Sequence, residues 1–155
     1  MPKDFHRLFS PGKIRKKRDD LDIYLTWSYN LSGAKLLSVP GAADAIHQVV
    51  MTWPDIEAHP HRFGGTEYRL GRREIGHIHG DYLLDIPFPT KVRDEIVAAG
   101  RAQRHHMLTE SGWVSFYLRE RSDIVEAIAL LRKSYDLAIS QRAKRKLPAD
   151  DLTHD

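Results

Sequence analysis

A run of short alternating segments separated by glycines most restricts what this chain can fold into. Residues 66–71 (TEYRLG) place Tyr68 and Leu70 two positions apart, and residues 74–80 (EIGHIHG) follow after a glycine-containing turn. Side chains two apart share one face of a strand, so each segment can bury one side and expose the other. Residues 81–88 either continue the second strand or form a third. The pattern predicts an antiparallel sheet built from hairpins.

One more strand and three helices complete the predicted architecture. Residues 113–119 alternate, with Val114 and Phe116 on one face and Ser115 on the other. The helical spacing of apolar residues predicts helices over three ranges: 40–53, 91–99 and 123–141. Hairpin strands flanked by helices indicate an α+β fold, with an antiparallel sheet of about four strands and helices packed on one face.

Charge and composition divide the chain into three parts. Residues 1–35 are interpreted as an N-terminal basic arm and extension, which carries the cluster KIRKKR at 13–18. Residues 36–141 hold the predicted α+β domain, and residues 142–155 are interpreted as a polar C-terminal tail that begins with the basic run 142–146. Basic runs of this kind favour weak contact with nucleic acid, or they are solvated tails without a partner.

The composition limits the cellular location of the protein and the kinds of reactive site that it can contain. The chain of 155 residues has no cysteine, which excludes disulfides, thiolate metal sites and a cysteine nucleophile. The first residues show no apolar run typical of a signal peptide, and no segment approaches the roughly 18 apolar residues of a membrane span. We therefore expect a soluble, cytoplasmic protein without membrane contact. The oligomeric state is left open.

Nine histidines are many for this length, and six of them form three pairs: His59 and His61, His77 and His79, His105 and His106. His77 and His79 are two apart on a predicted strand, so their imidazoles can point at one place. Two such imidazoles can bind zinc, iron or copper, with His106 or His105 completing the ligand set. The alternatives are a pocket for a non-metal ligand, and a structural role in which the histidines bond to the backbone.

Other chemistry is less well marked. Carboxylates such as Asp85 occur on the predicted strands, but no pair has a spacing diagnostic of general acid–base catalysis. The chain has neither a Gly-x-Ser-x-Gly elbow nor a P-loop. Four arginines form either an anionic-ligand patch or ordinary surface charge: Arg72, Arg73, Arg101 and Arg104. The sequence assigns no catalytic residue and leaves open whether the protein is an enzyme.

Several phrases together resemble a known family. They are HRFGGTEYRLGRREIGHIHGDYLLDIPFPTKVRDEIVAAGRAQRHH, SGWVSFYLR and ALLRKSYDLA, and the likeness runs from about residue 40 to 140. The set is similar to the bacterial and fungal family of small proteins described as luciferase-like or luciferase domain-containing, whose function is otherwise unknown. The element order also resembles, more distantly, the small YjbR-like α+β fold.

The resemblance implies a shared arrangement of residues rather than a known reaction. The candidate ligand-binding residues are His77, His79, Asp85, Arg101 and Trp113. The candidate metal ligands are His77, His79 and His106. The cofactor stays unknown: a divalent transition metal fits the histidines, and no flavin site is evident.

Three functions fit these observations. The first is a ligand-binding or accessory module whose polar, histidine-rich sheet face binds an unknown small ligand. The second is a metal-dependent enzyme that uses the His-x-His site and keeps an open coordination position for the reacting water or oxygen. The third is a nucleic-acid-binding protein that makes weak, salt-dependent contacts through residues 13–18 and 142–146.

Overall fold

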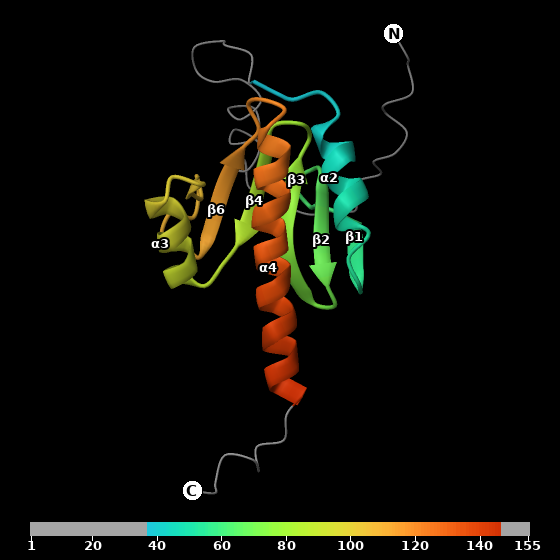
Figure 1. The fold of residues 1–155 in the computed structure, drawn as a ribbon, viewed down its shortest axis with the longest axis vertical. Coiled ribbons are helices and arrows are strands. Elements are labelled where there is room, and N and C mark those ends of the chain that lie inside the picture. Colours follow the sequence, from blue (N-terminus) through green and yellow to red (C-terminus); the bar gives the residue numbers. More distant parts are fainter. Residues whose placement is uncertain (1–36, 147–155) are drawn as a thin grey trace, which may run out of the picture. The chain divides into compact units, whose positions relative to one another are not determined.

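Six antiparallel strands form one sheet in the order β1-β2-β3-β4-β6-β5 (Figure 1). A computed structural model describes residues 37–146 of the chain. The strands are β1 (Ile56–Pro60), β2 (Thr66–Leu70), β3 (Arg73–His79), β4 (Leu83–Pro87), β5 (Gln103–Arg104) and β6 (Trp113–Tyr117). The helices are α2 (Ala42–Val50), α3 (Thr90–Ala98) and α4 (Asp123–Lys146). The predicted basic arm with its cluster at 13–18 lies outside the described residues, as do residues 147–155.

The predicted α+β class is confirmed, but the count of about four strands is wrong because the sheet has six. The additional strands are β1 and β5, which form the two edges of the sheet. In β1 only Ile56 and Ala58 pack against the hydrophobic core, and the strand ends at Pro60. β5 is two residues long and pairs only with β6 among the described strands. Such short edge strands carry too little alternation to be recognised in a sequence.

A β-bulge in the β2–β3 hairpin sets the side-chain directions of β3. The pairing passes from Tyr68 opposite Gly76 to Arg69 opposite Glu74, so Ile75 is an extra residue on β3. An extra residue reverses the alternation on the bulged strand. Glu74 therefore lies on the same face as His77, although three positions separate them, and their side chains are in contact.

The helices cover one face of the sheet, and the hydrophobic core lies between them. α4 crosses the middle of the sheet against β3 and β4, with α2 beside it (Figure 1). The close approach depends on Gly76, because a Cβ atom there would lie 2.7 Å from Cδ2 of Leu131 on α4. Ile78, Ile86 and Val114 point into this core from three neighbouring strands. The opposite face of the sheet is left to the polar side chains.

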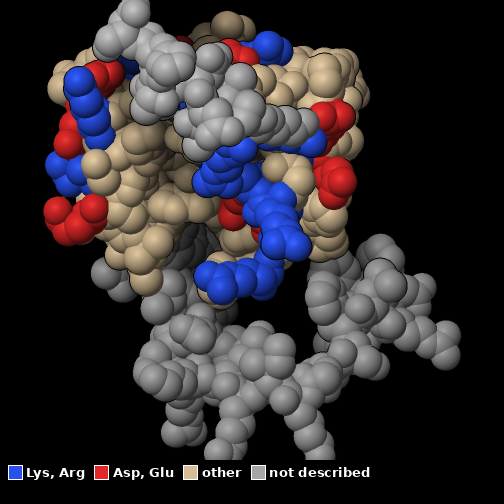
Figure 2. Space-filling view, turned by 90° about the horizontal axis from the view of Figure 1, so that it is seen from below, with Lys and Arg blue, Asp and Glu red and all other residues tan. Residues whose placement is uncertain are grey.

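α4 extends further than predicted and ends in a basic segment. The helix has 24 residues and continues five residues past the expected end at residue 141. Arg142 pairs with Asp55 at 3.1 Å. Figure 2, seen from the end at which α4 finishes, shows Lys and Arg side chains gathered there. Despite its length α4 is too charged to cross a membrane, and no other helix within residues 37–146 has the required length and apolar content.

Candidate metal centre

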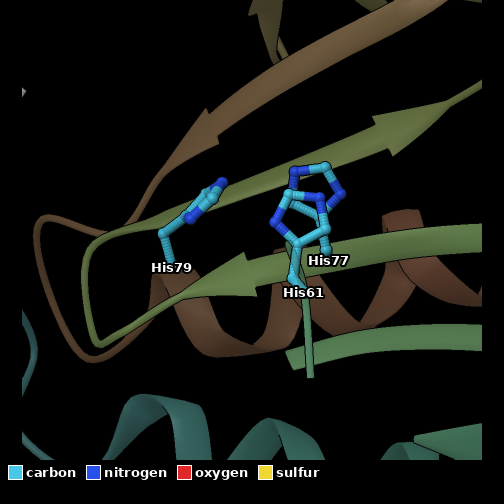
Figure 3. A group of neighbouring side chains, drawn as sticks. All are labelled: His61, His77 and His79. Carbon is cyan, nitrogen blue, oxygen red and sulfur yellow. The ribbon is translucent and has the colours of Figure 1, made fainter. Parts of the chain in front are cut away.

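Five histidines and one aspartate gather on the sheet face opposite the helices. They are His61 in the β1–β2 loop, His77 and His79 on β3, Asp85 on β4, and His105 and His106 directly after β5. The alternation of β3 turns both of its histidines to this face, where their ring centroids are 4.9 Å apart (Figure 3). Asp85 pairs with His77 in the β3–β4 register. Pairing between strands therefore assembles the cluster.

One carboxylate oxygen of Asp85 lies close to three imidazole nitrogens. The Asp85 side chain is 1 % exposed, and its Oδ2 atom is 3.4 Å from Nε2 of His77 and 3.5 Å from Nε2 of His79. Nε2 of His105 lies 3.6 Å from the same oxygen. Two ligands of a tetrahedral metal ion, each about 2.1 Å from the ion, are about 3.4 Å apart. The separations therefore fit a cation shared between the carboxylate and the imidazoles.

The charges within the cluster are arranged around the same carboxylate. Burial would raise the pKa of Asp85, but hydrogen bonds from His77, His79 and Ser115 hold that pKa well below its usual range. Burial would lower the pKa of His77, but hydrogen bonds to Asp85 and Glu74 outweigh it and raise the pKa to about 9. At neutral pH the buried carboxylate is thus ionised and protonated His77 neutralises it. A bound metal cation can take over that neutralising role.

Glu74 orients His77 within the cluster. Oε1 of Glu74 is 2.5 Å from Nδ1 of His77, while Nε2 of the same ring faces Asp85. A carboxylate on the far nitrogen is typical of metal-binding histidines, because it sets the tautomer and makes the ligating nitrogen more basic. The bulge in β3 creates this contact by bringing Glu74 to the polar face.

The Nε2 atom of His105 faces Asp85 at 3.6 Å. Its Nδ1 accepts hydrogen bonds from the backbone N–H groups of Met107 and Leu108, both at 3.1 Å. Burial lowers the pKa of His105, so the ring is neutral and carries its single proton on Nε2. A protonated Nε2 has no lone pair for a metal. His105 therefore holds the carboxylate rather than the ion.

Ser115 and His106 hold the other carboxylate oxygen. The hydroxyl of Ser115 donates to Oδ1 of Asp85 at 2.6 Å. Because that hydroxyl has only one proton, Nδ1 of His106, 3.0 Å from Ser115 Oγ, is the donor in their contact. Burial lowers the pKa of His106 to about 4, which keeps the ring neutral. Oδ1 is thus engaged in a hydrogen-bond chain, while Oδ2 faces the β3 histidines.

His61 joins the cluster from a loop. Figure 3 shows its ring lying over that of His77, with the centroids 3.8 Å apart and the planes inclined by 14°. Burial lowers the pKa of His61, and the charges of His77 and His79 lower it further. The Nδ1 atom of His61 is buried and finds no hydrogen-bond partner among the described residues. The ligand atoms of the three histidines lie within 4.8 Å of one another.

The structure brings most of the predicted site residues together. Those in the cluster are His77, His79, Asp85 and His106. Trp113 borders it, with its ring centroid 5.4 Å from that of His77. Nε of Arg101 donates to Glu126 of α4 at 2.7 Å, and the arginine lines a groove with residues of α4. It also lines a second pocket, which Ser115 borders.

Three residues in or beside the cluster are not among the predicted site residues: His61, Glu74 and Ser115. The His-Pro-His segment at 59–61 marks His61, but the loop that carries it has no regular spacing to place its side chain. Glu74 precedes His77 by three positions, which puts it on the opposite face of a regular strand. Ser115 was expected on the face that it occupies, without an assigned partner.

A comparison with known proteins identifies part of the chain. Residues 72–134 match the family model described as Luciferase domain. No curated protein and no solved structure gives a significant match. The matched segment begins at the turn before β3, ends within α4 and contains all of the cluster except His61. The YjbR-like resemblance stays a prediction. The match over residues 72–134 supports the predicted luciferase-like family.

Proposed function

We propose that this protein is a metal-dependent enzyme whose centre is a divalent transition metal ion held by His77, His79 and Asp85. The supporting observation is the buried Oδ2 atom of Asp85, 3.4 and 3.5 Å from the Nε2 atoms of two histidines on the neighbouring strand. Two imidazoles and one carboxylate with open positions are the donor set of non-haem iron(II) oxygenases. Zinc enzymes also use two histidines and a carboxylate. Iron(II) is therefore the first ion to test and zinc the second.

The remaining residues of the cluster would prepare the three ligands. Glu74 holds His77 with Nε2 toward the carboxylate, and Ser115 occupies Oδ1 of Asp85. His105 turns its protonated Nε2 toward Oδ2 at 3.6 Å and adds no competing lone pair. A bound ion would supply Lewis-acid or redox chemistry at its open positions. This proposal makes the predicted ligand-binding function more specific. The polar face would bind a metal ion, and a small substrate would bind beside that ion.

Metal titration of the untagged full-length chain tests the proposal. Co²⁺ added without oxygen should give about one tightly bound ion per chain at this centre, together with visible absorption bands. His77→Ala and Asp85→Asn should lose this ion. His59→Ala is the matched control, because His59 is a largely exposed histidine that pairs with Glu57 at 3.0 Å outside the proposed ligand set. Equal Co²⁺ binding by the wild type and Asp85→Asn would refute the centre.

The basic end of α4 favours a second candidate function, weak binding of nucleic acid. Burial and the nearby charge of Arg145 lower the pKa of Arg73, so two positive side chains lie close together at this end. A phosphate group placed between them would relieve their repulsion. Arg142 and Lys144 are exposed in the same final turns of the helix. The contact would be electrostatic and would weaken as salt is added.

A further inference from the structure

A second group of metal-ligating side chains lies beside the proposed centre, toward β2. His61, Glu67 and Glu74 offer ligand atoms that lie within 4.8 Å of one another. Glu67 is on β2, directly opposite His77 in the strand register. None of the three is a ligand of the proposed centre. The group thus lies on the same polar face and shares no residue with His77, His79 and Asp85.

The burial of Glu67 is unusual for a glutamate. Its side chain is only 8 % exposed, and glutamates are rarely so buried unless they are paired. The described partner is Arg69, whose side chain is 44 % exposed and reaches Glu67 from the solvent side. Glu74 contributes a second carboxylate within 4.8 Å of the first. Two carboxylates this close repel each other, and a cation between them removes the repulsion.

His61 supplies an independent sign of a ligand. Its Nδ1 atom is buried and without a hydrogen-bond partner among the residues described. A buried polar nitrogen that stays unpaired costs about 1–3 kcal/mol, so such atoms normally have a partner. The ring is held in place by stacking on His77. A metal ion is a suitable partner, because the nitrogen of a neutral imidazole is a common metal ligand.

The number of ligating side chains also exceeds what one ion uses. The three groups on this face, two of which share His61, contain eight different residues: His61, Glu67, Glu74, His77, His79, Asp85, His105 and His106. A zinc ion takes about four ligands and larger ions about six, and some of these are water. Even with His105 and His106 assigned to hold Asp85, six side chains in two triads are available. This is enough for two separate ions.

We propose that His61, Glu67 and Glu74 form a second divalent cation site, distinct from the centre on His77, His79 and Asp85. Two carboxylates and one imidazole form a harder donor set than two imidazoles and one carboxylate. The second site should therefore favour ions such as Mn²⁺ that prefer oxygen ligands. Arg69 competes with the cation for Glu67 and moves to solvent when the ion binds.

Electron paramagnetic resonance of added Mn²⁺ tests the second site in the full-length chain, since it counts the free ion directly. The wild type should bind two Mn²⁺ ions. Glu67→Gln should bind one Mn²⁺ ion, at the proposed centre. Asp85→Asn should also bind one, at the second site. The matched control Glu57→Gln should bind two, because the Glu57 side chain is 63 % exposed on β1 and pairs with His59. Arg69→Gln should tighten the second ion at least threefold, because the competing guanidinium is gone.

The outcomes separate this proposal from the proposed centre. A single ion that is lost in Asp85→Asn and kept in Glu67→Gln overturns the second site and leaves the centre intact. A single ion lost only in Glu67→Gln supports the second site and overturns the centre. Absence of bound Mn²⁺ overturns the second site, and Co²⁺ then decides the centre. If Glu67→Gln fails to fold, Arg69→Gln decides, and unchanged Mn²⁺ affinity in that variant overturns the second site.

Discussion

The hydroxyl of Ser115 donates a 2.6 Å hydrogen bond to Oδ1 of Asp85, and both residues are 1 % exposed. The two lie opposite each other on β6 and β4. Because Ser115 engages one oxygen of the carboxylate, the other oxygen is directed at His77 and His79. This cross-strand pair thus fixes the direction of a buried carboxylate, as the proposed metal centre requires.

Removing that hydroxyl should weaken both the fold and the proposed centre. Ser115→Ala should lower the free energy of unfolding by about 1.5–3 kcal/mol, the range for a hydrogen bond to a charged group. Metal affinity should fall about 10- to 100-fold, as is usual when a residue that orients a ligand is lost. Urea unfolding with chelator and Co²⁺ titration measure the two effects. Ser140→Ala is the control, because Ser140 is exposed and bonds only within α4; equal losses in both variants would contradict the role of Ser115.

Gly76 should tolerate no side chain. Its φ of +148° disfavours other residues, and a Cβ there would meet Cδ2 of Leu131 at 2.7 Å and the carbonyl oxygen of Asp85 at 3.2 Å. Gly76→Ala should therefore destabilise the protein by about 2–3 kcal/mol or more through overpacking. Gly100→Ala is matched, because Gly100 also has positive φ (+68°) but has no atoms within 4 Å of its added Cβ. Gly100→Ala should destabilise the protein by about 1 kcal/mol. Thermal melts that show equal losses of stability in the two variants would refute the packing argument.

The metal-free protein should lose stability as the pH rises above neutrality. His77 titrates at its ordinary pKa of 6.5 in the unfolded chain and at about 9 in the folded protein. Because the folded pKa is the higher one, the stabilisation is complete below pH 6.5 and is lost as the pH passes about 9. The loss should be about 3 kcal/mol. Urea unfolding with chelator across this range measures it, and His77→Gln should lack the alkaline decline.

The lowered pKa values of His61, His105 and His106 act in the opposite direction. These rings stay neutral when folded, so their contribution is lost only as the pH falls below the unfolded value. They therefore do not contribute to the loss of stability at alkaline pH, which comes from His77. A wild-type profile that stays flat up to pH 9 would contradict the raised pKa of His77.

His105 should exist as the Nε2–H tautomer both before and after metal binding. Two backbone N–H groups donate to its Nδ1, which leaves Nε2 to carry the proton. Two-bond proton–nitrogen NMR correlations distinguish a protonated from an unprotonated ring nitrogen. His59, which lies outside the proposed ligand set and pairs with Glu57, is the internal control, and its pattern should not change on adding zinc. A protonated Nδ1 on His105, or loss of its Nε2 proton on adding zinc, would show that His105 is a ligand instead.

Binding of duplex DNA should depend on salt through the end of α4. Each phosphate contact contributes about 0.9 to the slope of log affinity against log salt, so Arg145→Gln should reduce that slope by about 0.9. Arg121→Gln is the control, because Arg121 is exposed just before the opposite end of α4. Fluorescence anisotropy over a salt series gives both slopes. Absence of DNA binding at low salt, or identical slopes in the two variants, would remove the second candidate function.

Most of the regular structure could be predicted because its signals are local. The alternation of β2 and β6 and the apolar spacing of the helices each depend on neighbours within a few residues, and these predictions agree with the structure. The edge strands β1 and β5 escaped because they are short and their pairing depends on a partner strand. The bulge at Ile75 escaped for a related reason, since it reflects a mismatch between two strands rather than a property of one.

The sequence by itself indicated the likeness to the family and determined the shared face of His77 and His79, because strand alternation is a property of the chain's own geometry. Only the tertiary structure decided what those histidines meet. Asp85 reaches them through β3–β4 pairing, His105 through β5–β6 pairing, and His61 through a loop folded over the sheet. Such contacts join residues separated by up to several tens of positions, and their geometry is set by the register of the whole sheet. The division of the two oxygens of Asp85 between Ser115 and the histidines arises from that register alone.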